Sequence, residues 1–203
     1  MAHPAGSLPT PSRPRMTFEE FLRSPYRRAE WVNGAVLELS PENLEHSTIG
    51  GFLYALLAFF AEQHDLGRVL TGFLMKTGPG LAGRVPDILV LCGENEHRIR
   101  RNYIEGPADI AVEIVSPDSA TRDRETKLRE YENGGVREYW LIDPLERKAT
   151  FYSLEGQRFV VLPVETDGKV QSRVFPGLWL RPEWLLSEPR PKLAEVLRDW
   201  GLL

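Results

Sequence analysis

Residues 108–144, "ADIAVEIVSPDSATRDRETKLREYENGGVREYWLIDP", contain the most informative pattern of secondary structure in the chain. An apolar run is followed by a polar segment with helical spacing, expected from about Ser119 to Asn133, and then by a second apolar run. Gly134 and Gly135 provide the helix stop. Strand, helix and strand in this order predict a parallel pair with a right-handed crossover. The apolar runs "EYWLI" (138–142) and "DILVL" (87–91) lack clean alternation, which favours strands buried on both faces.

The segments that precede this unit extend the pattern. Residues 44–63 have helical spacing, with one stripe formed by His46, Ile49, Leu53, Leu56 and Phe60. Two apolar runs, "RVLTGFLMKTG" (68–78) and "RVPDILVLCG" (84–93), predict strands. From residue 44 to residue 143 the order is therefore helix, three strands, helix, strand. This order predicts an α/β fold with a mixed sheet between helices.

The two ends of the chain have simpler signals. Thr17 is a candidate N-cap of a short helix that Pro25 ends, and Asn33-Gly34 is a strong hairpin turn signal. After residue 144, turns at Gly156 and Gly168 predict an antiparallel strand meander, and residues 191–201 predict a short amphipathic helix. Residues 1–16 are rich in Pro and Ser and are expected to form a disordered tail, without the apolar core of a secretory signal.

Composition limits the classes of protein that need to be considered. The 203 residues are 42% hydrophobic and 27% charged, which predicts one soluble globular domain over residues 17–203. No apolar run approaches the ~20 residues of a membrane span, so no membrane partner is expected. The single cysteine, Cys92, excludes an internal disulfide and favours the cytoplasm. The net charge of −4 excludes a generally basic nucleic-acid coat, so any nucleic-acid binding must be local.

Two of the predicted strands carry an acid that is costly to bury. Asp87 begins "DILVL", and Glu113 lies within "ADIAVEIV". A buried carboxylate needs a partner, a hydrogen bond or a metal. If the two strands are neighbours, the acids lie side by side, and a shared cation relieves their repulsion. Oxygen ligands without nearby His or Cys favour Mg²⁺ or Mn²⁺ over zinc.

A third candidate residue lies on the helix that follows. Lys127 can reach back toward Glu113, where an ammonium could orient an attacking water or balance charge on a pentavalent phosphorus. Structural alternatives remain open for all three residues. Asp87 could accept backbone hydrogen bonds at a strand start, Glu113 could form only a salt bridge to Lys127, and Lys127 could form a surface pair with Asp123.

The segment from Glu113 to Pro144, together with "PD" at residues 86–87, resembles the Uma-two family of the PD-(D/E)XK nuclease superfamily. The resemblance runs from about Phe18 to Trp184. Glu30, Gly34, His46 and "FPGLWL" (175–180) are supporting matches. The superfamily core has the order helix, three strands, helix, strand. The resemblance therefore implies a restriction-endonuclease-like fold.

The same resemblance implies roles for individual residues. Asp87 and Glu113 would be the metal ligands, and the carbonyl of Ile114 would complete the site. The superfamily lysine stands two residues after the acid, where this chain has Val115, and the family moves it to the next helix, where Lys127 matches. Glu30 and His46 could lie at the site edge; otherwise they are an ordinary hairpin acid and a packed residue at a helix start.

These observations predict a divalent-metal-dependent endonuclease that hydrolyses phosphodiester bonds in nucleic acid, with DNA as the expected substrate. The alternative is a nucleic-acid-binding or protein-interaction module with the same fold and no turnover. A homodimer is expected, because many nucleases cut both strands as two-fold pairs. The connection at 92–108 carries Arg98, Arg100 and Arg101, which could overhang the site and bind phosphates; otherwise it is a solvated loop.

Overall fold

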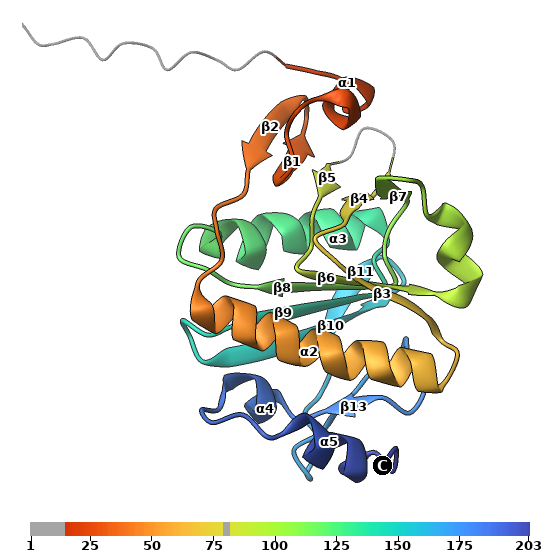
Figure 1. The fold of residues 1–203 in the computed structure, drawn as a ribbon, viewed down its shortest axis with the longest axis vertical. Coiled ribbons are helices and arrows are strands. Elements are labelled where there is room, and N and C mark those ends of the chain that lie inside the picture. Colours follow the sequence, from red (N-terminus) through yellow and green to blue (C-terminus); the bar gives the residue numbers. More distant parts are fainter. Residues whose placement is uncertain (1–14, 79–81) are drawn as a thin grey trace, which may run out of the picture.

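The computed structural model describes residues 15–78 and 82–203, so almost all of the predicted N-terminal tail lies outside the described residues. Within these ranges the strands form a six-stranded, a five-stranded and a two-stranded sheet. The six-stranded sheet lies at the centre of the molecule (Figure 1). Its order is β11-β10-β9-β8-β6-β3, and these strands span Arg158–Val161, Lys148–Glu155, Glu138–Asp143, Ile110–Ile114, Ile88–Cys92 and Gly67–Thr71.

The central sheet is mixed, as the strand-helix-strand pattern predicts. β8 and β9 are parallel, with Val112 opposite Trp140, and the chain between them includes η2 (Arg122–Lys127) and α3 (Leu128–Gly134). β6 is antiparallel to β8, with Ile88 opposite Val112. The two acid-bearing strands are therefore direct neighbours, which confirms the condition for bringing Asp87 and Glu113 together.

Two helices cover the central sheet from opposite faces (Figure 1). α2 (Leu44–Gln63) begins at the N-cap Asn43 and buries the whole predicted stripe from His46 to Phe60. On the other face, Tyr131 of α3 packs with Leu89 and Ala111. By length and composition alone, α2 would pass as a membrane span, contrary to the expectation that no run approaches that length. Its stripe packs in the largest core cluster, so it is a core helix.

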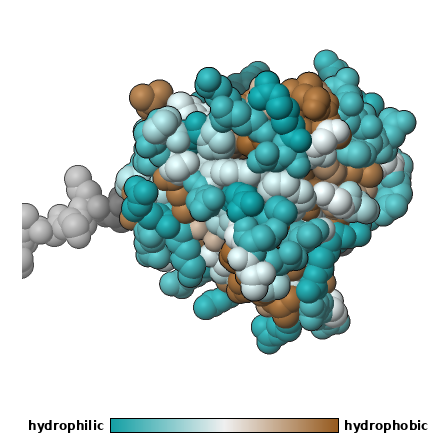
Figure 2. All heavy atoms as spheres, turned by 90° about the horizontal axis from the view of Figure 1, so that it is seen from below, coloured by the Kyte–Doolittle hydropathy of each residue, from teal (hydrophilic) through white to brown (hydrophobic). Residues whose placement is uncertain are grey.

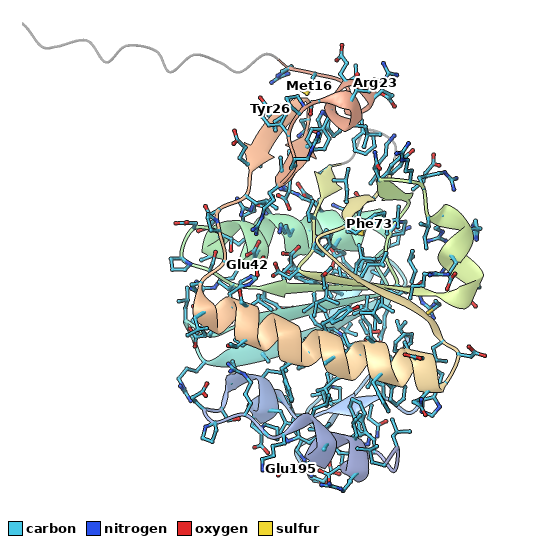
Figure 3. All side chains as sticks on the ribbon, in the orientation of Figure 1. Met16, Arg23, Tyr26, Glu42, Phe73 and Glu195 are labelled. Atoms are coloured by element: carbon cyan, nitrogen blue, oxygen red, sulfur yellow. The ribbon has the colours of Figure 1, made fainter. Side chains whose placement is uncertain are left out.

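A smaller layer lies beyond α3 and contains the N-terminal elements (Figure 1). α1 (Phe18–Arg23) has the predicted cap at Thr17, and Asn33 and Gly34 turn the hairpin with φ values of 50° and 87°. Met16 and Tyr26 pack in this layer (Figure 3). The five-stranded sheet has the order β2-β1-β5-β4-β7, with bounds Ala35–Glu38, Ala29–Val32, Gly83–Arg84, Leu74–Lys76 and Tyr103–Glu105.

Some predicted elements differ in extent. The runs 68–78 and 84–93 are each divided between the two sheets, because Gly72 (φ 58°) and Pro86 interrupt them. Of the predicted C-terminal meander, β10 and β11 join the central sheet. β12 (Val170–Gln171) and β13 (Trp179–Leu180) form a separate ribbon. The remaining elements are η1 (Gly93–Arg98), α4 (Pro182–Leu186) and the predicted C-terminal helix, α5 (Leu193–Asp199).

The face seen from below in Figure 2 is mostly hydrophilic, with apolar side chains interrupted by polar ones. Exposed apolar side chains scattered in this way are ordinary for a protein surface. The polar features that distinguish this molecule lie in a pocket at one end of the β6–β8 pair.

Candidate metal centre

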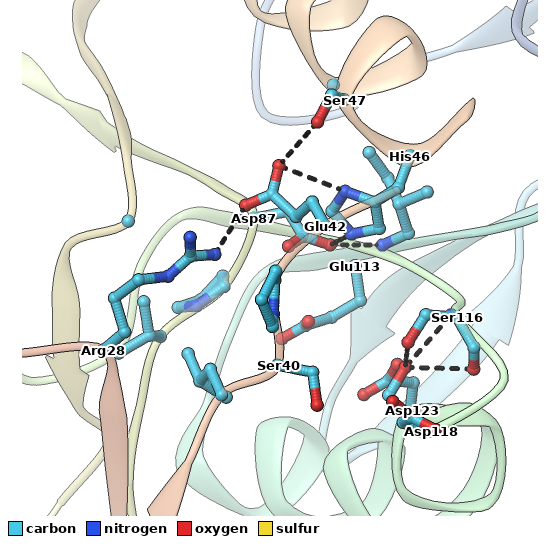
Figure 4. A pocket seen from close by; sticks show the side chains of 18 of the residues that line it. Arg28, Ser40, Glu42, His46, Ser47, Asp87, Glu113, Ser116, Asp118 and Asp123 are labelled. Atoms are coloured by element: carbon cyan, nitrogen blue, oxygen red, sulfur yellow. Dashed lines mark hydrogen bonds and ion pairs between the residues drawn. The ribbon is translucent and has the colours of Figure 1, made fainter. Parts of the chain in front are cut away.

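Asp87 and Glu113 lie at the same end of two neighbouring antiparallel strands. Asp87 directly precedes β6, and Glu113 is the next-to-last residue of β8. The backbone N–H of Ile114 donates to Asp87 Oδ2 at 2.6 Å. Both acids line one pocket of about 680 Å³ (Figure 4). The structure thus brings the two acids together, and Ile114, whose carbonyl is the third predicted ligand, lines the same pocket.

Glu113 is buried and both of its carboxylate oxygens are engaged. Lys127 Nζ donates to Oε2 at 2.7 Å, and the Tyr131 hydroxyl donates to Oε1 at 2.6 Å. Burial raises the pKa of Glu113 well above its ordinary value, and Asp123 and Asp87 raise it further, while Lys127 opposes the shift. The salt bridge to Lys127 therefore exists, and it lies inside the pocket wall.

Lys127 is the shared cation of a buried cluster with Glu30, Glu113 and Asp123, and it is only 3% exposed. Its Nζ lies 2.7 Å from Glu113 Oε2, 3.3 Å from Glu30 Oε1 and 3.3 Å from Asp123 Oδ1. Burial opposes the charge of the ammonium, but these carboxylates outweigh burial and raise the pKa of Lys127 above its ordinary value. The alternative of a surface pair between Lys127 and Asp123 is wrong, because both side chains are buried.

Glu30 joins the smaller sheet to the cluster. It is fully buried on β1 and accepts hydrogen bonds from Arg84 Nη1 at 2.6 Å and from the Val85 N–H at 3.2 Å. Although burial acts to raise the pKa of Glu30, Lys127 and Arg84 lower it below its ordinary value. Arg84 also donates to both oxygens of Glu130. The interpretation of Glu30 as an ordinary hairpin acid is therefore wrong.

A π-helical turn places Lys127 and Asp123 in the same buried cluster. η2 has a wider backbone than the ordinary helix that the spacing over 119–133 predicts, and regular α-helix resumes at Leu128. The hydroxyl of Tyr139 donates to the carbonyl of Asp123 at 2.9 Å, which satisfies one backbone group of this turn. Single π-helical turns often occur at functional sites, so this departure from the prediction marks the same segment as the lysine.

His46 contacts the first acid directly. Its Nε2 lies 3.2 Å from Asp87 Oδ2 and its Nδ1 lies 3.4 Å from Glu42 Oε2. Burial lowers the pKa of His46, but Asp87 and Glu42 outweigh burial and raise it above its ordinary value. Figure 4 shows His46, Glu42 and Asp87 grouped on one side of the pocket, with Asp118 and Asp123 on another. His46 therefore lies at the edge of the site and contacts Asp87, so it does more than pack at the start of α2.

The arginines of the connection at 92–108 are not brought to this pocket. Because β6 and β8 are antiparallel, the segment that joins them leaves from the end opposite Asp87 and Glu113. Arg98 donates to the Pro107 carbonyl at 3.1 Å, and Arg100 pairs with Glu105 at 2.8 Å. The expectation that this connection overhangs the acids is wrong. The pocket wall includes three other arginines, namely Arg27, Arg28 and Arg122.

Sequence reasoning missed several partners of the predicted residues. Arg84 and Glu130 come from β5 and α3, and nothing local in the sequence connects them with Glu30. Tyr131 is a core residue, as its apolar spacing indicates, but its hydroxyl also binds Glu113. Asp123 offered a signal, because it precedes Lys127 by four residues.

The donor set fits a hard divalent cation with few protein ligands. Within residues 15–78 and 82–203, no group of three or more His, Cys, Asp and Glu side chains is arranged to hold a metal. Mg²⁺ commonly uses one or two carboxylates and keeps several waters, which two acids in a roomy pocket allow. Carboxylates outnumber cations here, since Glu30, Glu113 and Asp123 share Lys127. A divalent cation would relieve this excess of negative charge.

Comparisons with known proteins bear on the family and the fold of the chain. The model of the Uma2 family, described as "Putative restriction endonuclease", matches residues 18–183. No curated protein matches the chain. A crystal structure of "a putative nuclease belonging to DUF820" from Anabaena variabilis is similar with a TM-score of 0.69 and 23% identity, over 84% of this chain and 97% of that chain. The likeness shows a shared fold, consistent with a restriction-endonuclease-like core. The family match covers most of the sequence, and the chain therefore belongs to the Uma2 family.

Proposed function

We propose that this Uma2 protein is a divalent-metal-dependent endonuclease that hydrolyses phosphodiester bonds in DNA. One observation carries the proposal: Asp87 and Glu113 line one pocket at the same end of adjacent strands, with the buried Lys127 bonded to Glu113. The family description supports a nuclease. The pocket is large enough to admit a nucleotide and its phosphate.

The chain's own residues have distinct roles in this proposal. Asp87, Glu113 and the Ile114 carbonyl would hold Mg²⁺ or Mn²⁺. When bound, such an ion polarises a phosphoryl oxygen and lowers the pKa of a coordinated water. The Lys127 ammonium and the Tyr131 hydroxyl each donate to one oxygen of Glu113, and together they fix the position of its carboxyl group. His46 holds Asp87 from the side of α2.

A panel of single-stranded, duplex and branched DNAs tests this proposal. We expect cleavage with Mg²⁺ or Mn²⁺, none with excess chelator, and none in Asp87→Asn. The matched control is Asp109→Asn, at the opposite end of β8, which should retain cleavage in its folded fraction. Metal-independent cleavage, or full cleavage by folded Asp87→Asn, would contradict the proposal.

A binding module without turnover is the second candidate. The observation that favours it is that both oxygens of Glu113 already have protein partners, as in a purely structural salt bridge. This candidate predicts that the wild-type protein binds DNA but leaves every substrate of the panel intact with either metal. The same panel therefore separates the two candidates.

The assembly and the compartment belong to the same proposal. We propose a homodimer, so that two pockets can act on the two strands of a duplex, and the cytoplasm as the location. Sedimentation equilibrium with and without duplex DNA tests the first point, and a strictly monomeric complex would contradict it. Imaging of a fluorescent fusion tests the second.

A further inference from the structure

We infer that Arg122 is the side chain that binds a phosphate of the substrate in this pocket, in place of Lys127. The inference rests on the proposed function and assigns a contact within the same site. A cation of the pocket can bind a phosphate only if it still has hydrogen-bond donors to offer. Three arginines and Lys127 line the wall, and their existing contacts differ.

Lys127 has no donor left for a phosphate. An ammonium has three N–H donors and no acceptor. Lys127 Nζ lies within 3.3 Å of three carboxylates, and its side chain is 3% exposed. Turning it toward a substrate would leave those buried carboxylates without their shared cation, which is strongly unfavourable. Lys127 is therefore a positioning residue for Glu113.

Two of the pocket arginines are engaged by the protein at the surface. Arg28 pairs with Glu42 at 3.0 Å, and its side chain is 59% exposed. Arg27 donates to the Ser24 carbonyl at 3.1 Å. Both lie beside the N-terminal hairpin, and solvent screens their charge. Both arginines add positive potential at the mouth of the pocket. Neither of them is buried with a hydrogen-bond donor left unused.

Arg122 combines both features. Within the described residues its Nε is buried and has no hydrogen-bond partner, and its ion pair with Asp123 Oδ1 is long, at 4.0 Å. Its side chain is 31% exposed, so part of the guanidinium can be reached from the pocket. It is the first residue of η2, the π-helical turn that also carries Asp123 and Lys127.

The chemistry of this position suits a phosphodiester. A guanidinium presents a planar set of donors that matches two phosphate oxygens, and its bonds to phosphate are charge-assisted. The acids of the pocket repel a polyanion, so a substrate needs a cation within the same wall to approach them. Asp123 already shares Lys127, which leaves Arg122 able to exchange its long contact for a phosphate.

The test is DNA binding without metal. A short fluorescein-labelled DNA, single-stranded or duplex, is titrated in chelator at several salt concentrations and followed by anisotropy. We expect Arg122→Ala to weaken binding about tenfold or more at low salt, and to reduce the log-log salt slope by about 1. Arg122→Lys should keep the slope and lose part of the affinity. Arg129→Ala, an exposed arginine of α3 that does not line the pocket, is the matched control and should stay near wild type.

Arg122→Gln keeps a polar side chain without the positive charge and serves if the alanine variant unfolds. Unchanged affinity in Arg122→Ala and Arg122→Gln, equal losses in Arg129→Ala, or no binding by wild-type protein at low salt would each overturn the inference. The proposed nuclease activity is judged separately by cleavage with Mg²⁺ or Mn²⁺. Arg122-dependent binding without cleavage would reject the endonuclease and keep the inference. If folded Arg122 variants cleave DNA as well as wild type and bind it with unchanged affinity, the endonuclease proposal is kept and the inference about Arg122 is rejected.

Discussion

The two ends of strand β8 have acids in opposite environments. At one end, Asp109 accepts hydrogen bonds from the Cys92 N–H at 2.8 Å, from Asn95 at 2.9 Å and from Arg137 at 3.1 Å. At the other end, Glu113 shares Lys127 with two further carboxylates and faces a pocket. Donors outnumber acids around Asp109, whereas acids outnumber cations around Glu113. Both acids are buried, so burial does not distinguish them; the charge balance of their neighbours does.

Lys127, which pairs with Glu113, and Arg137, which pairs with Asp109, should differ strongly in their contribution to the stability of the fold. Lys127→Met leaves three buried carboxylates without their shared cation, so the free energy of unfolding should fall by about 3–5 kcal/mol. Arg137→Met should cost less than about 1 kcal/mol, because Arg137 is 46% exposed and Asp109 keeps its other two donors. Urea unfolding measures both. Equal losses would show that the two ends do not differ in charge balance.

Neutralising the acids should have effects of opposite sign. Asp109→Asn replaces an acceptor of three donors with a group that accepts fewer bonds, and it should cost about 1–3 kcal/mol. Glu113→Gln removes a carboxylate whose pKa is raised by burial and by neighbouring acids, so its ionised form is disfavoured in the fold. We expect the metal-free Glu113→Gln protein to be as stable as wild type or more stable. If Glu113→Gln lost as much free energy of unfolding as Asp109→Asn, the two acids would not differ in their contribution to stability.

His46 should influence the metal without holding the fold together. Removing a group that orients a metal ligand typically weakens metal affinity about 10–100-fold. His46→Gln should therefore lower Mn²⁺ affinity by about tenfold while DNA affinity without metal stays near wild type. His97→Gln, on an exposed histidine of η1, is the control. Unchanged Mn²⁺ affinity in His46→Gln would show that the contact of His46 with Asp87 does not support metal binding.

The smallest effect is expected from the arginines of the connection between β6 and β8. Arg98→Ala, Arg100→Ala and Arg101→Ala combined should change the log-log salt slope of DNA binding by less than about 1. These residues lie at the Asp109 end of the strands, away from the pocket. A slope change near 3 would restore the connection as the docking surface and make Arg122 secondary.

The sequence predicts those features of the site that depend on local spacing. Strand period and apolar runs predict that Asp87 and Glu113 meet, and the following helix brings Lys127 within reach of Glu113. The resemblance to the Uma-two family supports the same lysine. The cluster of Glu30, Arg84 and Lys127 was not predictable from spacing, because it joins two sheets and a helix through long-range contacts. The end of the sheet from which the β6–β8 connection leaves also depends on the antiparallel pairing, which apolar runs do not reveal.

Calorimetric titration with Mn²⁺ shows whether the pocket end of β8 binds a divalent cation while the Asp109 end does not. We predict that wild-type protein and Asp109→Asn bind Mn²⁺ with the same affinity, provided that both are folded by circular dichroism. Asp87→Asn and Glu113→Gln should each lose this binding. The account would be contradicted if wild-type protein binds no Mn²⁺, or if folded Asp87→Asn and Glu113→Gln bind it as tightly as wild type.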